Sequence, residues 1–146
     1  MGHEEALVQA FVVPARRATY LARLAAPKSR QRFINRHFAH MEDLDERYAE
    51  KLDPGMPLVE FESRAAAHVE LIYELLRDRG APRRCFAVSA EPELDGQEHD
   101  LREALDQVVG STFGTFLSCI PGRLAYFEGE SPNRRYILER PPSSQE

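Results

Sequence analysis

The stretch GTFLSCIPGRLAYFEGE, residues Gly114–Glu130, contains two apolar runs joined by a Pro-Gly dipeptide. Pro121 and Gly122 are typical of the central positions of a type II turn, because glycine tolerates the positive φ of the second position. The run TFLSCI places its side chains alternately on two faces, as a strand does. The stretch therefore predicts a β-hairpin, and the rest of the chain is interpreted outward from it.

Cys119 lies inside the first strand of this hairpin, where it is either a catalytic or a structural residue. A catalytic thiol needs thiolate character, supplied by a neighbouring base or a helix N-terminus, and partial exposure to solvent. The alternation of TFLSCI places Cys119 beside Leu117 on one face, and no histidine lies close to it in the sequence. We therefore expect a buried structural cysteine.

Strand-like segments flank the hairpin on both sides, so that residues 85–139 form a sheet region. CFAVSA predicts a buried strand before the hairpin, and RRYILER predicts another after the turn ESPN. Between CFAVSA and the hairpin, EPELDGQEHD predicts a solvated loop with an Asp-Gly turn. The following DLREALDQVV predicts a short amphipathic helix that ends at Gly110.

Residues 60–79 carry the clearest helical pattern in the chain. Gly80 follows as a C-terminal stop, because glycine takes the left-handed conformation that commonly ends a helix. Apolar residues recur at helical spacing on one face, which we expect to be buried. These residues are Phe61, Ala65, Val69, Ile72 and Leu76.

Residues 14–41 predict a helical hairpin. Pro14 suits the first turn of a helix, where its missing N–H has no partner to lose. Pro27 is expected to stop this helix, and Ser29 is the expected N-cap of the next one. Residues 4–13 stay ambiguous, since EEALVQAF can begin a helix whereas FVV before a proline favours extended backbone.

The order of these elements, helices first and strands afterwards, predicts an α+β fold. We expect N-terminal helices packed on a small, mostly antiparallel sheet of about four strands, with one further helix. A chain of 146 residues predicts one domain, which we place at residues 1–140. The remaining residues 141–146, PPSSQE, predict a disordered tail.

The charges are distributed unevenly along the chain. The net charge is −5, yet no Asp or Glu occurs between Ala6 and Met41. From Glu42 onward, 22 acidic residues face 12 basic ones. A basic N-terminal third followed by an acidic remainder is compatible with an interaction surface on the hairpin, with pairing to the chain's own acidic body, or with a solvated face that has no specific role. Its seven bases are Arg16, Arg17, Arg23, Lys28, Arg30, Arg32 and Arg36.

This basic helical hairpin is the strongest candidate binding surface. Lys and Arg bind phosphates with release of counterions, and an acidic protein surface complements the same charges. The net charge of −5 and the pI of 5.6 argue against a general nucleic-acid binder. We expect a non-catalytic binding or regulatory protein whose hairpin contacts an acidic partner, either a protein or a nucleic acid.

The alternative is a small enzyme or ligand-binding protein, with its pocket where the sheet meets the loop 91–100. Such a site would use Cys119, Asp95 or Glu128 for chemistry.

A second, weaker ligand site is suggested by VVGSTFGTF, whose small and hydroxyl residues resemble a phosphate loop. Phosphate loops open onto a helix N-terminus, however, and this segment follows a helix C-terminus. Ser111 and Thr112 are the candidate residues of this segment, and Arg123 is a further weak ligand-binding candidate in the pocket of the alternative site.

The loop 91–100 also contains part of a calcium-binding pattern. Glu91, Glu93, Asp95 and Gly96 fall at the first, third, fifth and sixth positions of such a loop. The twelfth position should supply a bidentate Glu, and Arg102 stands there instead. We therefore expect no metal site, and no motif predicts a cofactor.

Four segments, FVVPARRATYLARL, PKSRQRF, ELDG and SCIPGRLAYFEGE, resemble those of small bacterial proteins of unassigned function. The resemblance covers most of the chain and implies a bacterial, cytoplasmic protein, without carrying over any functional residue. The two cysteines, Cys85 and Cys119, lack paired-motif spacing, which suits a reduced compartment. No apolar run reaches the length of a membrane span, so we expect no membrane segment.

Overall fold

The computed structural model describes residues 2–38, 41–52, 61–111, 113–129 and 134–141, with the backbone alone for 61–67. These residues form five α-helices, two 3-10 turns and a six-stranded antiparallel sheet. The predicted α+β class is confirmed. Four predicted features lie outside the described residues: Thr112, the ESPN turn, most of the C-terminal tail, and the side chains of Phe61 and Ala65.

The four central strands are the predicted ones. β4 (Thr115–Ile120) and β5 (Leu124–Glu128) form the hairpin, and Gly122 in its turn has a φ of 72°. β2 (Arg84–Ser89) pairs with β4, and β6 (Arg135–Glu139) pairs with β5. Every pairing is antiparallel, which confirms the strands expected around the hairpin.

Two short edge strands were not predicted. β1 (Ala49–Lys51), which follows a 3-10 turn η2 (Glu46–Tyr48), pairs with β6, and β3 (Glu98–Asp100) pairs with β2. The sheet order is therefore β1-β6-β5-β4-β2-β3. AEK and EHD are polar and partly exposed, so neither shows the apolar pattern of a strand. The predicted sheet of about four strands therefore lacked its two edge strands. These strands form by backbone pairing with β6 and β2, which their own side chains do not indicate.

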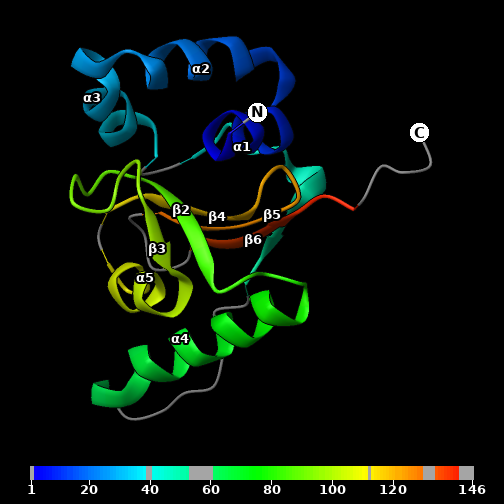
Figure 1. Cartoon of the computed structure of the whole chain (residues 1–146), viewed down its shortest axis with the longest axis vertical. Helices are drawn as coiled ribbons and strands as arrows, with labels where there is room; N and C mark the ends of the chain where they lie inside the picture. The colour runs from blue at the N-terminus through cyan, green and yellow to red at the C-terminus, as the bar shows by residue number, and fades with distance from the viewer. Residues whose placement is uncertain (1, 39–40, 53–60, 112, 130–133, 142–146) are drawn as a thin grey trace.

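Helices cover both faces of the sheet (Figure 1). α1 (His3–Phe11), α2 (Arg17–Ala25) and α3 (Pro27–His37) lie on one face. α4 (Phe61–Asp78) and α5 (Leu101–Val108) lie on the other. None of the helices in the described parts of the chain has the length and apolar composition to cross a bilayer.

Each face of the sheet has its own hydrophobic core, and β4 shows how they are separated. Phe116 packs in the core under α1–α3, whereas Leu117 and Cys119 pack in the core under α4 and α5. The predicted alternation of β4 is confirmed from Phe116 to Cys119, but it is wrong at Ile120, which packs against the core under α4 and α5 after a register shift between Ser118 and Ile120. On α4, Ile72 and Leu76 are fully buried against the second core, as the helical pattern predicted.

The start of the second hairpin helix was predicted wrongly. α3 begins at Pro27, with Ala26 as its N-cap, and Ser29 lies inside the first turn. Proline suits this first helical position because its missing N–H has no partner to lose. Pro14 likewise begins a helical turn, the 3-10 turn η1 (Pro14–Arg16). The ambiguous residues 4–13 are mostly helical, since α1 continues to Phe11 before the chain becomes extended.

Candidate anion-binding groove

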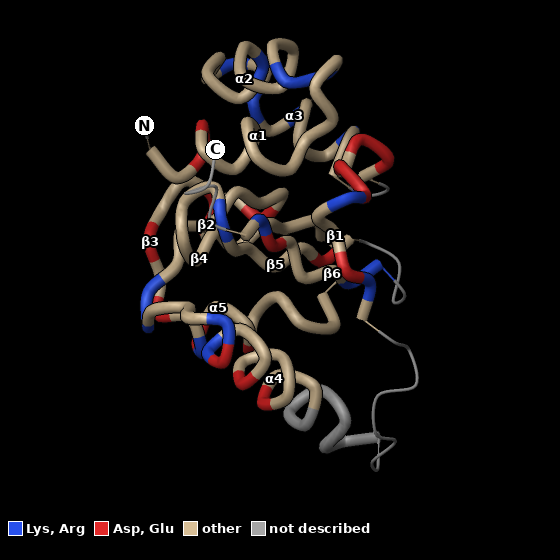
Figure 2. Tube along the Cα trace, turned by 90° about the vertical axis from the view of Figure 1, so that its right-hand side faces the viewer, with Lys and Arg blue, Asp and Glu red and all other residues tan. Residues whose placement is uncertain are grey.

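α2 and α3 form a tight pair because their facing sides pack around aromatic rings. Tyr20 and Phe33 meet edge to face with their centroids 4.9 Å apart, and Leu24 and Ile34 are buried in the same core. These contacts leave the polar sides of both helices toward solvent. Neither helix contains an Asp or Glu, so Lys and Arg are their only ionised side chains (Figure 2).

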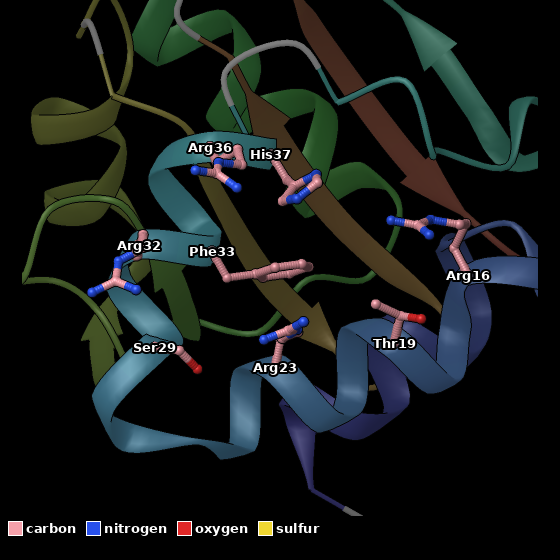
Figure 3. Close-up of a pocket in the computed structure, with 8 residues that line it drawn as sticks. All are labelled: Arg16, Thr19, Arg23, Ser29, Arg32, Phe33, Arg36 and His37. Carbon is pink, nitrogen blue, oxygen red and sulfur yellow. The ribbon is translucent and has the colours of Figure 1, made fainter.

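An open groove of about 400 Å³ lies between α2 and α3 (Figure 3). Its basic side chains come from η1, α2 and α3 and surround a common hollow. No Asp or Glu contributes to the lining. The lining residues are Arg16, Thr19, Arg23, Ser29, Arg32, Phe33, Arg36 and His37.

Three of these arginines have no anionic partner among the residues that the structure describes. Arg23, Arg32 and Arg36 are exposed, and none makes an ion pair or hydrogen bond with another residue that the structure describes. Arg16 is placed at the rim, where its Nε lies 3.6 Å from Oδ2 of Asp43. The groove therefore concentrates positive charge that one carboxylate at its edge neutralises only in part.

His37 lies at the C-terminal end of α3 and faces this positive charge. Its ring centroid is 4.5 Å from that of Phe33 and 6.2 Å from that of Tyr20. Burial lowers the pKa of His37 below its usual range, and Arg16 and Arg36 lower it further, while Asp43 opposes them. The lowered pKa favours the neutral imidazole at pH 7.

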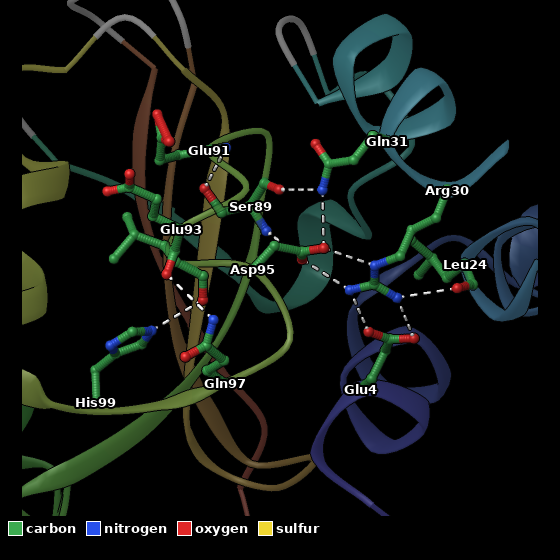
Figure 4. Close-up of polar contacts among 11 residues, drawn as sticks. Glu4, Leu24, Arg30, Gln31, Ser89, Glu91, Glu93, Asp95, Gln97 and His99 are labelled. Carbon is green, nitrogen blue, oxygen red and sulfur yellow. Dashed lines mark hydrogen bonds and ion pairs between the residues drawn. The ribbon is translucent and has the colours of Figure 1, made fainter. Parts of the chain in front are cut away.

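Arg30, also in the basic hairpin, is not part of the groove lining and belongs to a polar network (Figure 4). Its Nε and Nη2 donate to the two oxygens of Asp95 at 2.7 and 2.8 Å. The remaining N–H groups reach Glu4 at 2.7 and 2.9 Å and the carbonyl of Leu24 at 2.9 Å. All five donors of this guanidinium are therefore used inside the molecule.

Asp95 receives more than the Arg30 guanidinium. Its oxygens also accept from Nε2 of Gln31 at 2.9 Å and from the backbone N–H of Ser89 at 2.9 Å. Only 8% of its side chain is exposed, so the prediction that this loop is simply solvated was wrong at Asp95. The carboxylate connects α3 to the loop after β2, a structural role that uses both of its oxygens.

The seven predicted partner-binding residues thus separate into two groups. Arg16, Arg23, Arg32 and Arg36 line the groove. The other three do not, and each has a different position. Arg17 donates to the carbonyl of Val12 at 2.8 Å, Lys28 is exposed outside the groove, and Arg30 is in the internal network.

Four groove residues were not predicted as site residues: Thr19, Ser29, Phe33 and His37. Helical spacing is the signal that groups them with the arginines. Thr19 precedes Arg23 by four residues on α2, and Ser29, Arg32 and Phe33 recur at intervals of three and four on α3. The meeting of these two faces required the tertiary packing of the helices.

The thiol proposed for the alternative site is buried. Cys119 is 2% exposed, lies in the core under α4 and α5, and is a free thiol like Cys85. Burial raises the pKa of Cys119 well above its usual range and raises that of Cys85 to about 12. Both cysteines are therefore protonated at neutral pH, which is unfavourable for nucleophilic chemistry.

Glu128 is also buried and has partners of its own. Tyr126 Oη donates to it at 2.6 Å, the backbone N–H of Gly110 donates at 2.6 Å, and Arg135 Nε lies 3.3 Å away. Burial raises the pKa of Glu128, and these donors oppose the rise. The structure therefore gives separate contacts to each of the three side chains proposed for the alternative site, those of Cys119, Asp95 and Glu128.

The weaker ligand site receives no further support from its geometry. The backbone N–H of Gly110 is used by Glu128, and Ser111 Oγ donates to the carbonyl of Phe113 at 3.4 Å. Arg123 is exposed in the β4–β5 turn. Within the residues that the structure describes, no group of three or more His, Cys, Asp or Glu side chains is arranged to hold a metal ion.

Searches against family models, curated proteins and solved structures find no match to this chain. A functional interpretation therefore depends on the groove itself. Its distinctive property is the combination of clustered arginines, partial enclosure and a lining without carboxylates.

Proposed function

We propose that this protein is a non-catalytic binding protein that receives an anionic group of an acidic partner in the groove between α2 and α3. The observation that carries the proposal is that Arg23, Arg32 and Arg36 lack an ion-pair partner among the described residues yet share one hollow. Like charges held together raise the free energy of the unliganded protein. An anionic group that enters the groove removes this repulsion and gains charge-assisted hydrogen bonds.

The charge distribution of the whole chain supports a local contact. From Glu42 onward the net charge is −10, given 22 acidic and 12 basic residues. An extended polyanion that lay along the acidic body would be repelled, whereas a group inserted between α2 and α3 meets four arginines and no carboxylate in the lining. Both an acidic protein segment and a nucleic-acid strand meet this condition if the contact is confined to the groove.

The enzymatic alternative has less support. Its three candidate side chains are occupied by internal hydrogen bonds or enclosed in the core, as described above for Cys119, Asp95 and Glu128. The groove contains His37 as a titratable base, but its other polar side chains are arginines and hydroxyls. Such a lining is suited to binding charge.

Fluorescence anisotropy with two labelled probes, a polyglutamate peptide and a single-stranded oligonucleotide, tests the proposal at low salt. The groove variant carries Arg23→Gln, Arg32→Gln and Arg36→Gln. We expect it to bind at least one probe about tenfold more weakly than the wild type, since three lost contacts of about 0.5–1 kcal/mol each exceed the 1.4 kcal/mol of a tenfold change.

The matched control carries Lys28→Gln, Arg83→Gln and Arg123→Gln, which remove the same charge from exposed positions outside the groove. It should bind within about twofold of the wild type, because these positions lie at the rim or beyond the contact. Equal losses of affinity in both variants would show that binding depends only on net charge, which would contradict the proposal. Failure of the wild type to bind either probe would contradict it as well.

A further inference from the structure

We infer that the group recognised by the groove is a phosphomonoester, an inference that rests on the proposed function and specifies its chemistry. The groove arginines, the hydroxyls beside them and the size of the hollow each point to a compact group with more than one negative charge. The sources of such a group are a phosphorylated residue of a partner protein and a phosphorylated small molecule.

The number of arginines is the first argument, and the protein supplies its own comparison. A single guanidinium, that of Arg30, forms ion pairs with two carboxylates, Glu4 and Asp95. The groove brings four guanidinium groups to one hollow with no carboxylate in the lining. A phosphomonoester carries about two negative charges and three strong acceptor oxygens at pH 7, so it matches this surplus of donors better than one carboxylate does.

The kind of base is the second argument. The groove lining contains four arginines and no lysine, and the one lysine of the hairpin, Lys28, lies outside the groove. Arginine presents a planar set of donors that binds phosphate oxygens two at a time, whereas lysine acts as a point charge. The lining therefore favours geometric recognition of phosphate over simple attraction to an acidic surface.

The hydroxyl groups provide a third argument. Thr19 and Ser29 line the groove on opposite helices, and neither hydroxyl has a hydrogen-bond partner among the described residues. A hydroxyl donates one hydrogen bond to a phosphate oxygen that guanidinium groups leave open. A hollow of about 400 Å³ is at the small end of ligand pockets and holds a phosphate with the part of the molecule that bears it.

The test uses three small anions at matched ionic strength: glycerol phosphate, succinate and dimethyl phosphate. Succinate matches the charge of the monoester without a phosphate, and dimethyl phosphate is a diester of the kind found in nucleic acids. The readout is the NMR titration of the His37 ring, which faces Arg16 on η1, Arg23 on α2, Arg36 on α3 and Asp43. A bound anion should raise the pKa of His37, since it favours the protonated ring.

We expect glycerol phosphate to bind saturably and about tenfold more tightly than either comparison anion, with a raised pKa of His37. Arg32→Gln/Arg36→Gln should weaken this binding about tenfold, while the matched control Arg83→Gln/Arg123→Gln should leave it unchanged. Equal binding of succinate, preference for dimethyl phosphate, or binding that does not depend on Arg32 and Arg36 would overturn the inference.

A phosphoserine peptide distinguishes the two sources of the monoester. Binding of this peptide about tenfold more tightly than glycerol phosphate supports a phosphorylated protein, and equal or weaker binding supports a small molecule. If the small anions fail but the polyanion probes still lose affinity in the groove variant, the phosphomonoester inference fails and the proposed function stands. If the groove variant binds the polyanion probes as the wild type does, the proposed function fails.

Discussion

Arg30 and the groove arginines belong to the same helical hairpin, yet their surroundings are opposite. Arg30 has a side chain only 17% exposed and donates to Glu4 and Asp95. Arg32 and Arg36, on the same helix, are exposed around the groove without an ion pair to a described residue. The comparison separates an arginine that connects parts of the fold from arginines whose charge remains available to another molecule.

The largest effect should come from breaking the Arg30 network. Arg30→Gln leaves the carboxylates of Glu4 and Asp95 in partly buried positions without their cation, so we expect the free energy of unfolding to fall by about 3 kcal/mol. Urea denaturation followed by circular dichroism measures this loss. Arg36→Gln is the matched control on the same helix and should change stability by no more than about 0.5 kcal/mol. Equal losses of stability in the two variants would remove the distinction between Arg30 and the groove arginines.

A smaller effect of opposite sign is expected in the groove. The Arg23→Gln/Arg32→Gln/Arg36→Gln variant should be more stable than the wild type by a few tenths of a kcal/mol at low salt, because like charges no longer repel. Glutamine and arginine have similar helix propensity, so the change in stability reflects the loss of charge. At about 1 M salt, where the Debye length is about 3 Å, the gain should vanish. A loss above about 1 kcal/mol would show that these arginines stabilise the fold.

The smallest effect concerns the pH dependence of stability at His37. The folded pKa is lowered from the usual value of about 6.5, so the folded protein binds fewer protons than the unfolded chain between the two values. Stability should therefore rise with pH through this window and fall as the pH drops below about 6.5. In His37→Gln this part of the slope should be lost, as measured by urea denaturation at pH about 5.5 and about 7.5. An unchanged slope would mean that burial and the groove charge together do not lower the pKa of His37.

Much of the fold could be predicted from the sequence because local signals agree with the tertiary structure. The β4–β5 hairpin follows from its Pro-Gly turn, and α4 follows from a long apolar face that ends at Gly80. The edge strands β1 and β3 could not be predicted, since their polar residues become strands by pairing with β6 and β2. The basic hairpin was also predictable, but the choice among its arginines was not.

The sequence by itself determined most of the helices, the β4–β5 hairpin and the basic character of residues 14–41, because periodicity, turn chemistry and charge are properties of neighbouring residues. Only the tertiary structure decided that Arg30 meets Asp95, a residue 65 positions away, while Arg23, Arg32 and Arg36 surround the groove. Ion pairing depends on distance in space, and packing of the hairpin against the sheet sets that distance. Arginines that look alike in the sequence therefore differ in their contacts.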